Sequence, residues 1–314
     1  MRVLVTGGGG FLGAASVRAL LARGDTAIAF DTQWSGLPDE AERLVRVTGS
    51  ITDLAGLAQA MLVHKPDALV HAAALVGVLA SLGSPLEVVR VNVEGSINVF
   101  EAMRLARVRR CIHLSSEEAY GEFRTQPVEE THPLDPVWPY GVCKAAVEQL
   151  GRGYRDLHGL EVINLRTSWV YGPDLPRERI PRNLVEAALA GRSLHVPSGA
   201  EVAIDHTYID DLVTGVLAAL DHAQHRFDAY NIASGQAPTV AELVSIVREL
   251  VPGAQLSVGA GPYRHGDRIE MVRKGALDVG RAAAELGWRP RYDIRAGLSA
   301  YVDALRNAPR REPR

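Results

Sequence analysis

The chain has 314 residues, of which 47% are hydrophobic and 23% are charged. This balance supplies a large core, in one big domain or in one and a half. A formal net charge of −3 provides no global basic field, so neither nucleic acid nor a membrane surface is expected as a partner.

The two cysteines, Cys111 and Cys143, stand in apolar or helical stretches. Buried, reduced thiols are the expected state, which fits a reducing cytosol and a cytoplasmic protein. The chain opens on a strand-like run without an apolar leader, and no apolar run approaches the length of a membrane span.

Short apolar runs alternate with helix-like stretches through the first half of the chain. The strand-like runs are Val3–Thr6, Thr26–Phe30, Val45–Val47, Ala68–His71, Arg110–Ser115 and Glu161–Arg166. The helix-like runs are Phe11–Ala22, Leu54–Val63, Pro85–Arg107 and Tyr140–Leu157. This alternation predicts an α/β fold of the Rossmann type, a doubly wound parallel sheet with helices on both faces.

A glycine-rich turn connects the first strand to the first helix. Gly7, Gly10 and Gly13 have the spacing Gly-x-x-Gly-x-x-Gly, and Phe11 and Leu12 open the helix. The first two glycines allow a tight turn and close approach of the backbone to a pyrophosphate, and the third lets helix and strand pack closely. The helix N-terminus adds amide donors and positive dipole, so this context predicts a dinucleotide site.

Asp31 ends the second strand, 18 residues after Gly13. An acidic side chain at this position accepts the adenosine ribose hydroxyls and repels a 2′-phosphate. No arginine immediately follows to hold such a phosphate. The sequence therefore favours NAD over NADP as the cofactor.

Tyr140 and Lys144 stand four residues apart at the start of a predicted helix. This spacing is about one turn, so the phenol and the ammonium project from the same face. A nearby positive charge favours the phenolate, and we expect Lys144 to lower the pKa of Tyr140 from its ordinary value of about 10. Such a tyrosine exchanges a proton with a substrate hydroxyl.

Together these motifs resemble the extended short-chain dehydrogenase/reductase family, which includes NAD-dependent sugar-nucleotide epimerases and dehydratases. The resemblance runs from Met1 to about Leu305. It covers the glycine turn, His71–Ala74, Asn92–Gly95 with Asn98, Leu114–Ser116 with Ala119–Gly121, Tyr140 with Lys144, Val170–Pro173, Tyr208–Asp211 and Glu285–Trp288.

The resemblance implies further cofactor contacts. These would come from Ala72, Ala73, Ala74, Asn92, Ser50 and Ile51, with Tyr140 and Lys144 near the nicotinamide ribose. Ser50 stands where the family usually has an aspartate beside the adenine, so it keeps an acceptor but loses the charge.

The resemblance also gives Ser116 the role of holding the reacting oxygen at the end of the fifth strand. The next residues, Glu117 and Glu118, resemble the acidic pair of sugar-nucleotide dehydratases, whereas simple epimerases usually have small or neutral residues here. A carboxylate pair does acid/base work when its environments separate the two pKa values. A solvated loop pair without a chemical role is the alternative.

The substrate region departs from the family pattern. Trp169 replaces the usual Asn before Val-Tyr-Gly, and Ile204 replaces an Arg that contacts phosphate. Arg264 to Asp267 resembles an Arg-Pro-Gly-Asp that holds the nucleotide. The candidate substrate contacts are Val76, Trp169, Arg179, His206, Arg264 and Asp267. No His, Cys and Asp spacing indicates a metal site.

These motifs predict how the chain divides into domains. We expect an NAD-binding domain at residues 1–172 with returning segments near 205–235, a mainly substrate-binding lobe at 173–305 and a flexible tail at 306–314. Helices 93–107 and 140–157 would form a homodimer interface, as the resemblance implies.

The sequence is compatible with three functions. The first is an epimerase or dehydratase that acts on a sugar nucleotide through a transient keto intermediate and recycles NAD. The second is a dehydrogenase of a smaller sugar, sugar acid or secondary alcohol that releases NADH. The third is a non-catalytic NAD-sensing module, which the Tyr140 and Lys144 pair disfavours.

Overall fold

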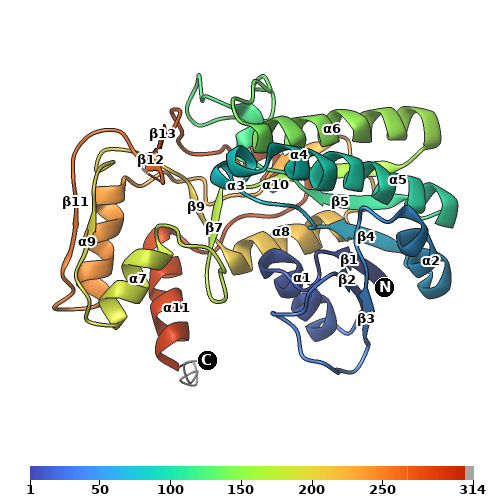
Figure 1. Cartoon of the computed structure of the whole chain (residues 1–314), viewed down its shortest axis with the longest axis horizontal. Helices are drawn as coiled ribbons and strands as arrows, with labels where there is room; N and C mark the ends of the chain where they lie inside the picture. Colours follow the sequence, from blue (N-terminus) through green and yellow to red (C-terminus); the bar gives the residue numbers. More distant parts are fainter. Residues whose placement is uncertain (267, 308–314) are drawn as a thin grey trace.

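The computed structural model describes residues 1–266 and 268–307. Its centre is a parallel sheet with the strand order β10-β6-β5-β4-β1-β2-β3 (Figure 1). The strands are β1 (Arg2–Thr6), β2 (Thr26–Asp31), β3 (Leu44–Thr48), β4 (Ala68–His71), β5 (Arg110–Leu114), β6 (Glu161–Arg166) and β10 (Ala229–Asn231). The predicted α/β fold with a doubly wound parallel sheet is confirmed.

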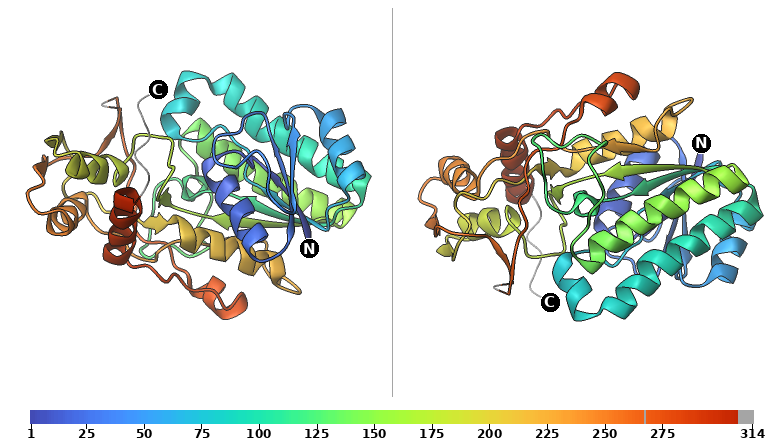
Figure 2. Two further views of the ribbon diagram at one scale, coloured as in Figure 1. Left: turned by 90° about the horizontal axis from the view of Figure 1, so that it is seen from below. Right: turned by 90° about the horizontal axis from the view of Figure 1, so that it is seen from above.

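Helices lie on both faces of the sheet, as Figure 2 shows, and the strand side chains on both faces are buried. Val3 and Val5 of β1 pack into the core on one side, and Leu4 packs into the core on the other. Because successive side chains of each strand pack into the cores on opposite faces, the strands are apolar throughout and do not alternate between apolar and polar residues. The covering helices are α1 (Phe11–Ala22) and α8 (Ile209–Asp221) on one face, and α2 (Leu54–His64), α5 (Gly95–Ala106) and α6 (Pro139–His158) on the other.

The predicted helix at residues 85–107 is not continuous. The chain forms α3 (Val78–Gly83), α4 (Pro85–Val89), a π-helical turn η1 (Arg90–Glu94) and then α5. A π-helical turn adds a residue to one turn and often occurs at functional sites. Here it contains the buried Asn92.

Local sequence signals set the helix ends. Thr239 and Glu242 form a reciprocal capping box at the start of α9 (Val240–Leu250). Asp53 caps α2 by accepting from the Gly56 amide. Gly159 ends α6 with φ +67°, a left-handed conformation that favours glycine.

A second group of elements lies at one end of the sheet, here called the C-terminal lobe (Figure 1). It contains α7 (Arg182–Leu189), α9, α11 (Ile294–Asn307) and the strand pairs β7 (Trp169–Tyr171) with β9 (His206–Tyr208), β8 (Leu194–Val196) with β11 (Leu256–Val258), and β12 (Arg264–His265) with β13 (Ile269–Glu270). Three later elements return to the first half: α8 packs on α1, β10 pairs with β6, and α10 (Gly280–Glu285) packs beside β10. None of the described helices is long and apolar enough to cross a membrane.

Candidate active site

A cavity of about 630 Å³ lies at the carboxyl ends of the central strands. Its wall includes residues at or just beyond the ends of β1, β2, β4, β5 and β6: Gly7, Asp31, Ala72, Ser116 and Thr167. Further parts of the wall come from α6, from the start of α1, from the loop after β3 and from β7 with the loop that follows it. Parallel α/β sheets bind their ligands in this crevice.

The glycine turn leaves no room for side chains. Gly7 has φ +71°, and a Cβ there would lie 2.6 Å from the Ala73 nitrogen. A Cβ on Gly13 would lie 1.9 Å from the Gly7 carbonyl oxygen. Gly10 precedes α1 and has no side chain to cap it, so the first-turn amides of α1 lack a side-chain acceptor, and Phe11 and Leu12 of this turn line the cavity. This turn fits a pyrophosphate.

The end of β2 forms a second part of the same wall. Asp31 accepts from the Gly9 amide at 3.0 Å and from the Thr32 amide at 2.6 Å. Ser50 and Ile51 line the cavity beside it. A carboxylate oxygen has more than one acceptor site, so Asp31 keeps capacity for ribose hydroxyls. The geometry fits the adenosine end of NAD.

The loop after β4 lines the cavity through Ala72, Ala73 and Ala74. The predicted cofactor contact Asn92 lies behind this loop and is not part of the cavity wall. Its amide accepts from the Leu75 nitrogen at 2.8 Å and donates to the Leu75 oxygen at 2.9 Å. Asn92 therefore holds the loop in place through Leu75. Because both ends of its amide are bound there, it is not placed to contact the cofactor directly.

Tyr140, Lys144 and Ser116 meet in the centre of the cavity wall. The first two lie one turn apart on α6, and Ser116 caps the short helix η2 (Glu117–Tyr120) and hydrogen-bonds with the Tyr140 phenol. The Lys144 ammonium donates to the Leu114 carbonyl oxygen at 2.6 Å and lies 6.0 Å from the centroid of the Tyr140 ring. The structure thus brings these three of the five predicted catalytic residues together, and the other two, Glu117 and Glu118, line the same cavity.

The expectation that Lys144 lowers the pKa of Tyr140 is wrong. Burial raises the pKa of Tyr140 to about 12, and the charges that oppose this rise are Arg177 and Arg179. Burial also lowers the pKa of Lys144 to about 8. Sequence spacing placed the ammonium on the correct helix face, but it gave no measure of desolvation, which dominates both groups.

Glu117 and Glu118 are both buried in the cavity wall, so they are not a solvated loop pair. Glu117 accepts from the Ser168 hydroxyl at 2.8 Å, and its other oxygen has no partner among the described residues. Burial raises the pKa of Glu117 to about 7, against the attraction of Lys274. Glu118 forms an ion pair with Lys274, whose ammonium lies 3.3 Å from Oε2.

Sequence reasoning missed Lys274, which follows the substrate motif by several residues and has no motif of its own. It also missed Arg177, although Arg179 stands two residues later in the same loop. The Arg177 guanidinium donates to the Val76 carbonyl at 2.9 Å, and the Arg179 guanidinium lies 4.2 Å from the Trp169 ring centroid. Both arginines line the cavity, and neither forms an ion pair within the described residues.

Two predicted substrate residues lie away from the cavity wall. His206 is buried behind Trp169, with ring centroids 5.6 Å apart, and burial lowers its pKa to about 3. Arg264 lies on β12 with an exposed side chain. Asp267 lies outside the described residues. The position of His206 close to the substrate motifs in the sequence did not reveal that Trp169 lines the cavity and His206 does not.

Comparisons with known proteins agree with this geometry. The sequence pattern of the NAD dependent epimerase/dehydratase family matches residues 3–233. The chain is 32% identical to a UDP-glucose 4-epimerase of Mycolicibacterium smegmatis over 98% of this chain and 99% of that protein. It is 30% identical to a dTDP-glucose 4,6-dehydratase of an Actinoplanes species over 96% and 97% of the two chains.

A solved structure of a protein from the same family has a similar fold. UDP-glucose 4-epimerase of Thermotoga maritima, determined with UDP-glucose, superposes with a TM-score of 0.89 at 30% identity, over 98% of this chain and 99% of that one. The chain belongs to the NAD-dependent epimerase/dehydratase family of extended short-chain dehydrogenases/reductases, and it is an NAD-dependent enzyme.

Proposed function

We propose that this enzyme is a sugar-nucleotide dehydratase. It oxidises the sugar to a keto intermediate, eliminates water and returns the hydride to the carbon that lost its hydroxyl. The observation that carries this choice is the pair Glu117 and Glu118, two buried carboxyl groups in one cavity wall with Tyr140. Their environments differ, because Glu117 has a raised pKa and Glu118 pairs with Lys274. Two carboxyl groups in different environments can take separate acid and base roles.

The redox steps use the residues around Tyr140. NAD, when bound, would supply the hydride acceptor for the sugar carbon and the positive charge of its oxidised ring. Tyr140 takes the hydroxyl proton from the same carbon, helped by the charges of Arg177 and Arg179. Ser116 donates a hydrogen bond to the reacting oxygen, and Lys144 would hold the nicotinamide ribose.

The elimination uses the two glutamates. Glu118, as a carboxylate, takes the proton from the carbon next to the new carbonyl. The electron pair forms a carbon–carbon double bond, and the neighbouring hydroxyl leaves as water with the proton of Glu117. Hydride then returns to the carbon that lost the hydroxyl, and Glu118 returns its proton to the other carbon. The proton that Tyr140 gained balances the one that Glu117 gave.

A sugar nucleotide suits the charge of this cavity. Its diphosphate is an anion, and Arg177 and Arg179 are two guanidinium groups without an ion-pair partner among the described residues. Arginine binds phosphate with paired, charge-assisted hydrogen bonds. Trp169 and Val76 add apolar wall beside them. We assign NAD to residues 1–172 with the segments that return near 205–235, and the substrate mainly to residues 173–305.

A 4-epimerase is the second candidate, because the Mycolicibacterium and Thermotoga relatives carry that name. It needs Tyr140, Ser116 and Lys144 but no acidic pair. A dehydrogenase of a smaller sugar or sugar acid is a third. Net release of NADH in proportion to product would identify the dehydrogenase and reject both reactions that recycle the cofactor.

Glu117→Gln tests the proposed elimination. We expect water loss from a UDP- or dTDP-hexose, followed by mass spectrometry of the product, to slow by at least about 100-fold. Reduced cofactor should accumulate, because oxidation precedes the blocked step. In the wild type, dehydration should fall as pH rises through about 7, because an acid must be protonated to act. The variant should lack the decline near pH 7 that Glu117 causes.

The exposed Glu129 supplies a matched control, since Glu129→Gln makes the same change on the surface. It should leave turnover unaltered. If Glu117→Gln left turnover intact and the product were an epimer of unchanged mass, elimination would be wrong and the epimerase would stand.

We infer that two copies associate through helices 93–107 and 140–157. Exposed apolar side chains support this, since Leu86 is 82% exposed, Leu157 is 79% and Val142 is 49%. The helix α4 that contains Leu86 packs on α6, so these side chains belong to neighbouring helices. Light scattering that reports a monomer at micromolar concentration would reject this dimer.

We also propose a cytoplasmic location. Cys111 and Cys143 are free and buried, which fits a reducing compartment. Recovery of the protein outside the cytoplasmic fraction of its source cells would reject this location.

A further inference from the structure

Lys144 makes two contacts with strand β5 that the redox mechanism does not use. Its ammonium donates to the Leu114 carbonyl oxygen at 2.6 Å and lies 3.5 Å from Nε2 of His113. His113 is 1% exposed and Lys144 is 5% exposed. An ammonium has three donors, so one N–H remains for the cavity that Lys144 lines.

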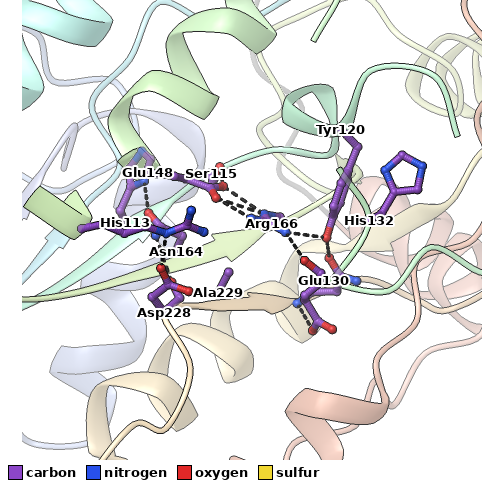
Figure 3. A network of polar contacts seen from close by, with 12 residues as sticks. His113, Ser115, Tyr120, Glu130, His132, Glu148, Asn164, Arg166, Asp228 and Ala229 are labelled. Carbon is purple, nitrogen blue, oxygen red and sulfur yellow. Dashed lines mark hydrogen bonds and ion pairs between the residues drawn. The ribbon is translucent and has the colours of Figure 1, made fainter. Parts of the chain in front are cut away.

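Neighbouring hydrogen bonds determine the tautomer of His113 (Figure 3). Asn164 on β6 donates its amide N–H to the Asp228 carbonyl oxygen at 2.9 Å, so its own oxygen faces Nδ1 of His113 at 2.8 Å. An amide oxygen only accepts, and therefore Nδ1 must bear the hydrogen. Burial keeps the pKa of His113 well below its usual range, so the ring is neutral. Its Nε2 lone pair then faces Lys144.

The other titratable groups near this ammonium are engaged elsewhere or neutral. Glu148, one turn after Lys144, accepts from Ser115 and is paired with Arg166. His71 on β4, whose ring centroid lies 5.5 Å from that of His113, has its pKa lowered to about 3 by burial. Burial raises the pKa of the Cys143 thiol. Among the described residues, the Leu114 carbonyl oxygen and Nε2 of His113 are the acceptors within hydrogen-bond distance of Lys144.

We propose that His113 is a positioning residue for Lys144: its neutral Nε2 accepts one N–H, the Leu114 carbonyl accepts a second, and the third is thereby directed into the cavity beside Tyr140. At 3.5 Å the contact with His113 is long, as catalytic hydrogen bonds often are before substrate binds. This inference rests on the proposed part of Lys144 in the redox steps and is independent of the elimination.

Two substitutions distinguish the roles of the two ring nitrogens of His113. His113→Gln keeps an acceptor near the position of Nε2, whereas His113→Asn keeps a donor near the position of Nδ1 and loses the contact with Lys144. We expect His113→Asn to slow cofactor reduction by about 10- to 100-fold, since small misplacements of catalytic groups have effects of this size. His113→Gln should stay within about threefold of the wild type on the same reasoning.

The pH profile distinguishes positioning from packing. An acceptor favours the ammonium, so its loss lowers the pKa of Lys144, which is about 8 in the wild type. The alkaline limb of cofactor reduction should therefore move to lower pH in His113→Asn and stay in place in His113→Gln. Cofactor reduction by a UDP- or dTDP-hexose is the readout because it precedes elimination, so it tests His113 even if the dehydratase proposal fails.

If both variants lost the same fraction of the rate of cofactor reduction, or if the alkaline limb stayed in place in His113→Asn, His113 would act only through packing and the proposal would be overturned. If neither variant folds, ¹⁵N NMR of the wild-type protein with labelled histidine decides the matter. A protonated Nδ1 and a bare Nε2 at His113 support the proposal. A protonated Nε2 overturns it, because that nitrogen cannot then accept from Lys144.

Discussion

Phenylalanine in place of Tyr140 is expected to lower kcat by about 1,000-fold or more, within the range measured for loss of a general acid or base. The phenol lies in the cavity wall, hydrogen-bonds with Ser116 and has two guanidinium groups that favour its ionised form. Phenylalanine keeps the ring and removes the proton-transfer group. Steady-state turnover of a sugar nucleotide, with separate titration of NAD binding, measures the effect.

Tyr154→Phe is the matched control for this substitution. Tyr154 lies on the same helix, α6, and donates to Glu101 at 2.8 Å, away from the cavity. Its variant should turn over at the wild-type rate. NAD affinity should also be retained in Tyr140→Phe, since the glycine turn and Asp31 are untouched. Full activity of Tyr140→Phe would remove the proton-transfer role from this residue.

The largest expected loss of stability comes from the buried ion pair of Glu148 and Arg166 (Figure 3). Their side chains are 0% and 2% exposed, and the shortest contact between them is 2.6 Å. Arg166 also donates to the Tyr120 hydroxyl and to the Glu130 carbonyl, each at 3.0 Å. The network thereby joins α6, β6 and the short helix η2 that contains both candidate glutamates.

Arg166→Met should lower the free energy of unfolding by about 3–5 kcal/mol, because it leaves the Glu148 charge buried without its partner. Denaturant unfolding followed by circular dichroism measures this. The double variant Arg166→Met/Glu148→Leu should be more stable than Arg166→Met, since it removes both charges. A loss below about 1 kcal/mol in Arg166→Met, the value typical of exposed pairs, would contradict this account.

An exposed ion pair provides the comparison. Arg124 and Asp135 are 59% and 69% exposed and lie 2.6 Å apart. Arg124→Ala should change the free energy of unfolding by no more than about 1 kcal/mol, although the distance is the same as in the buried pair. The contrast isolates burial, rather than geometry, as the source of the large effect.

Local patterns predicted most of the first half of the molecule. The first helix has the predicted bounds, and the first six strands of the sheet lie where apolar runs indicated. The glycine turn and Asp31 line one cavity wall, because both stand at the ends of adjacent parallel strands. These features depend on residues close together in the chain, and short-range rules of conformation describe them well.

Long-range contacts escaped prediction. Lys274 reaches Glu118 from the far end of the chain, and Arg177 contacts Val76 across the cavity. Asn92 belongs to a π-helical turn and binds Leu75 instead of lining the cavity. Motif spacing and composition carry no information on which residues distant in the chain come into contact in the fold. Motif matching therefore identified the strands and helices but missed these long-range contacts.

The sequence by itself determined the α/β sheet and the cofactor class, and it placed Tyr140 and Lys144 on one helix face, because each of these depends on residues within one turn or one strand end. Only the tertiary structure decided their electrostatics. Burial raises the pKa of Tyr140 and lowers that of Lys144, whereas the spacing predicted an effect of the lysine on the tyrosine. Desolvation depends on everything that surrounds a group, and a folded chain is needed to supply those surroundings.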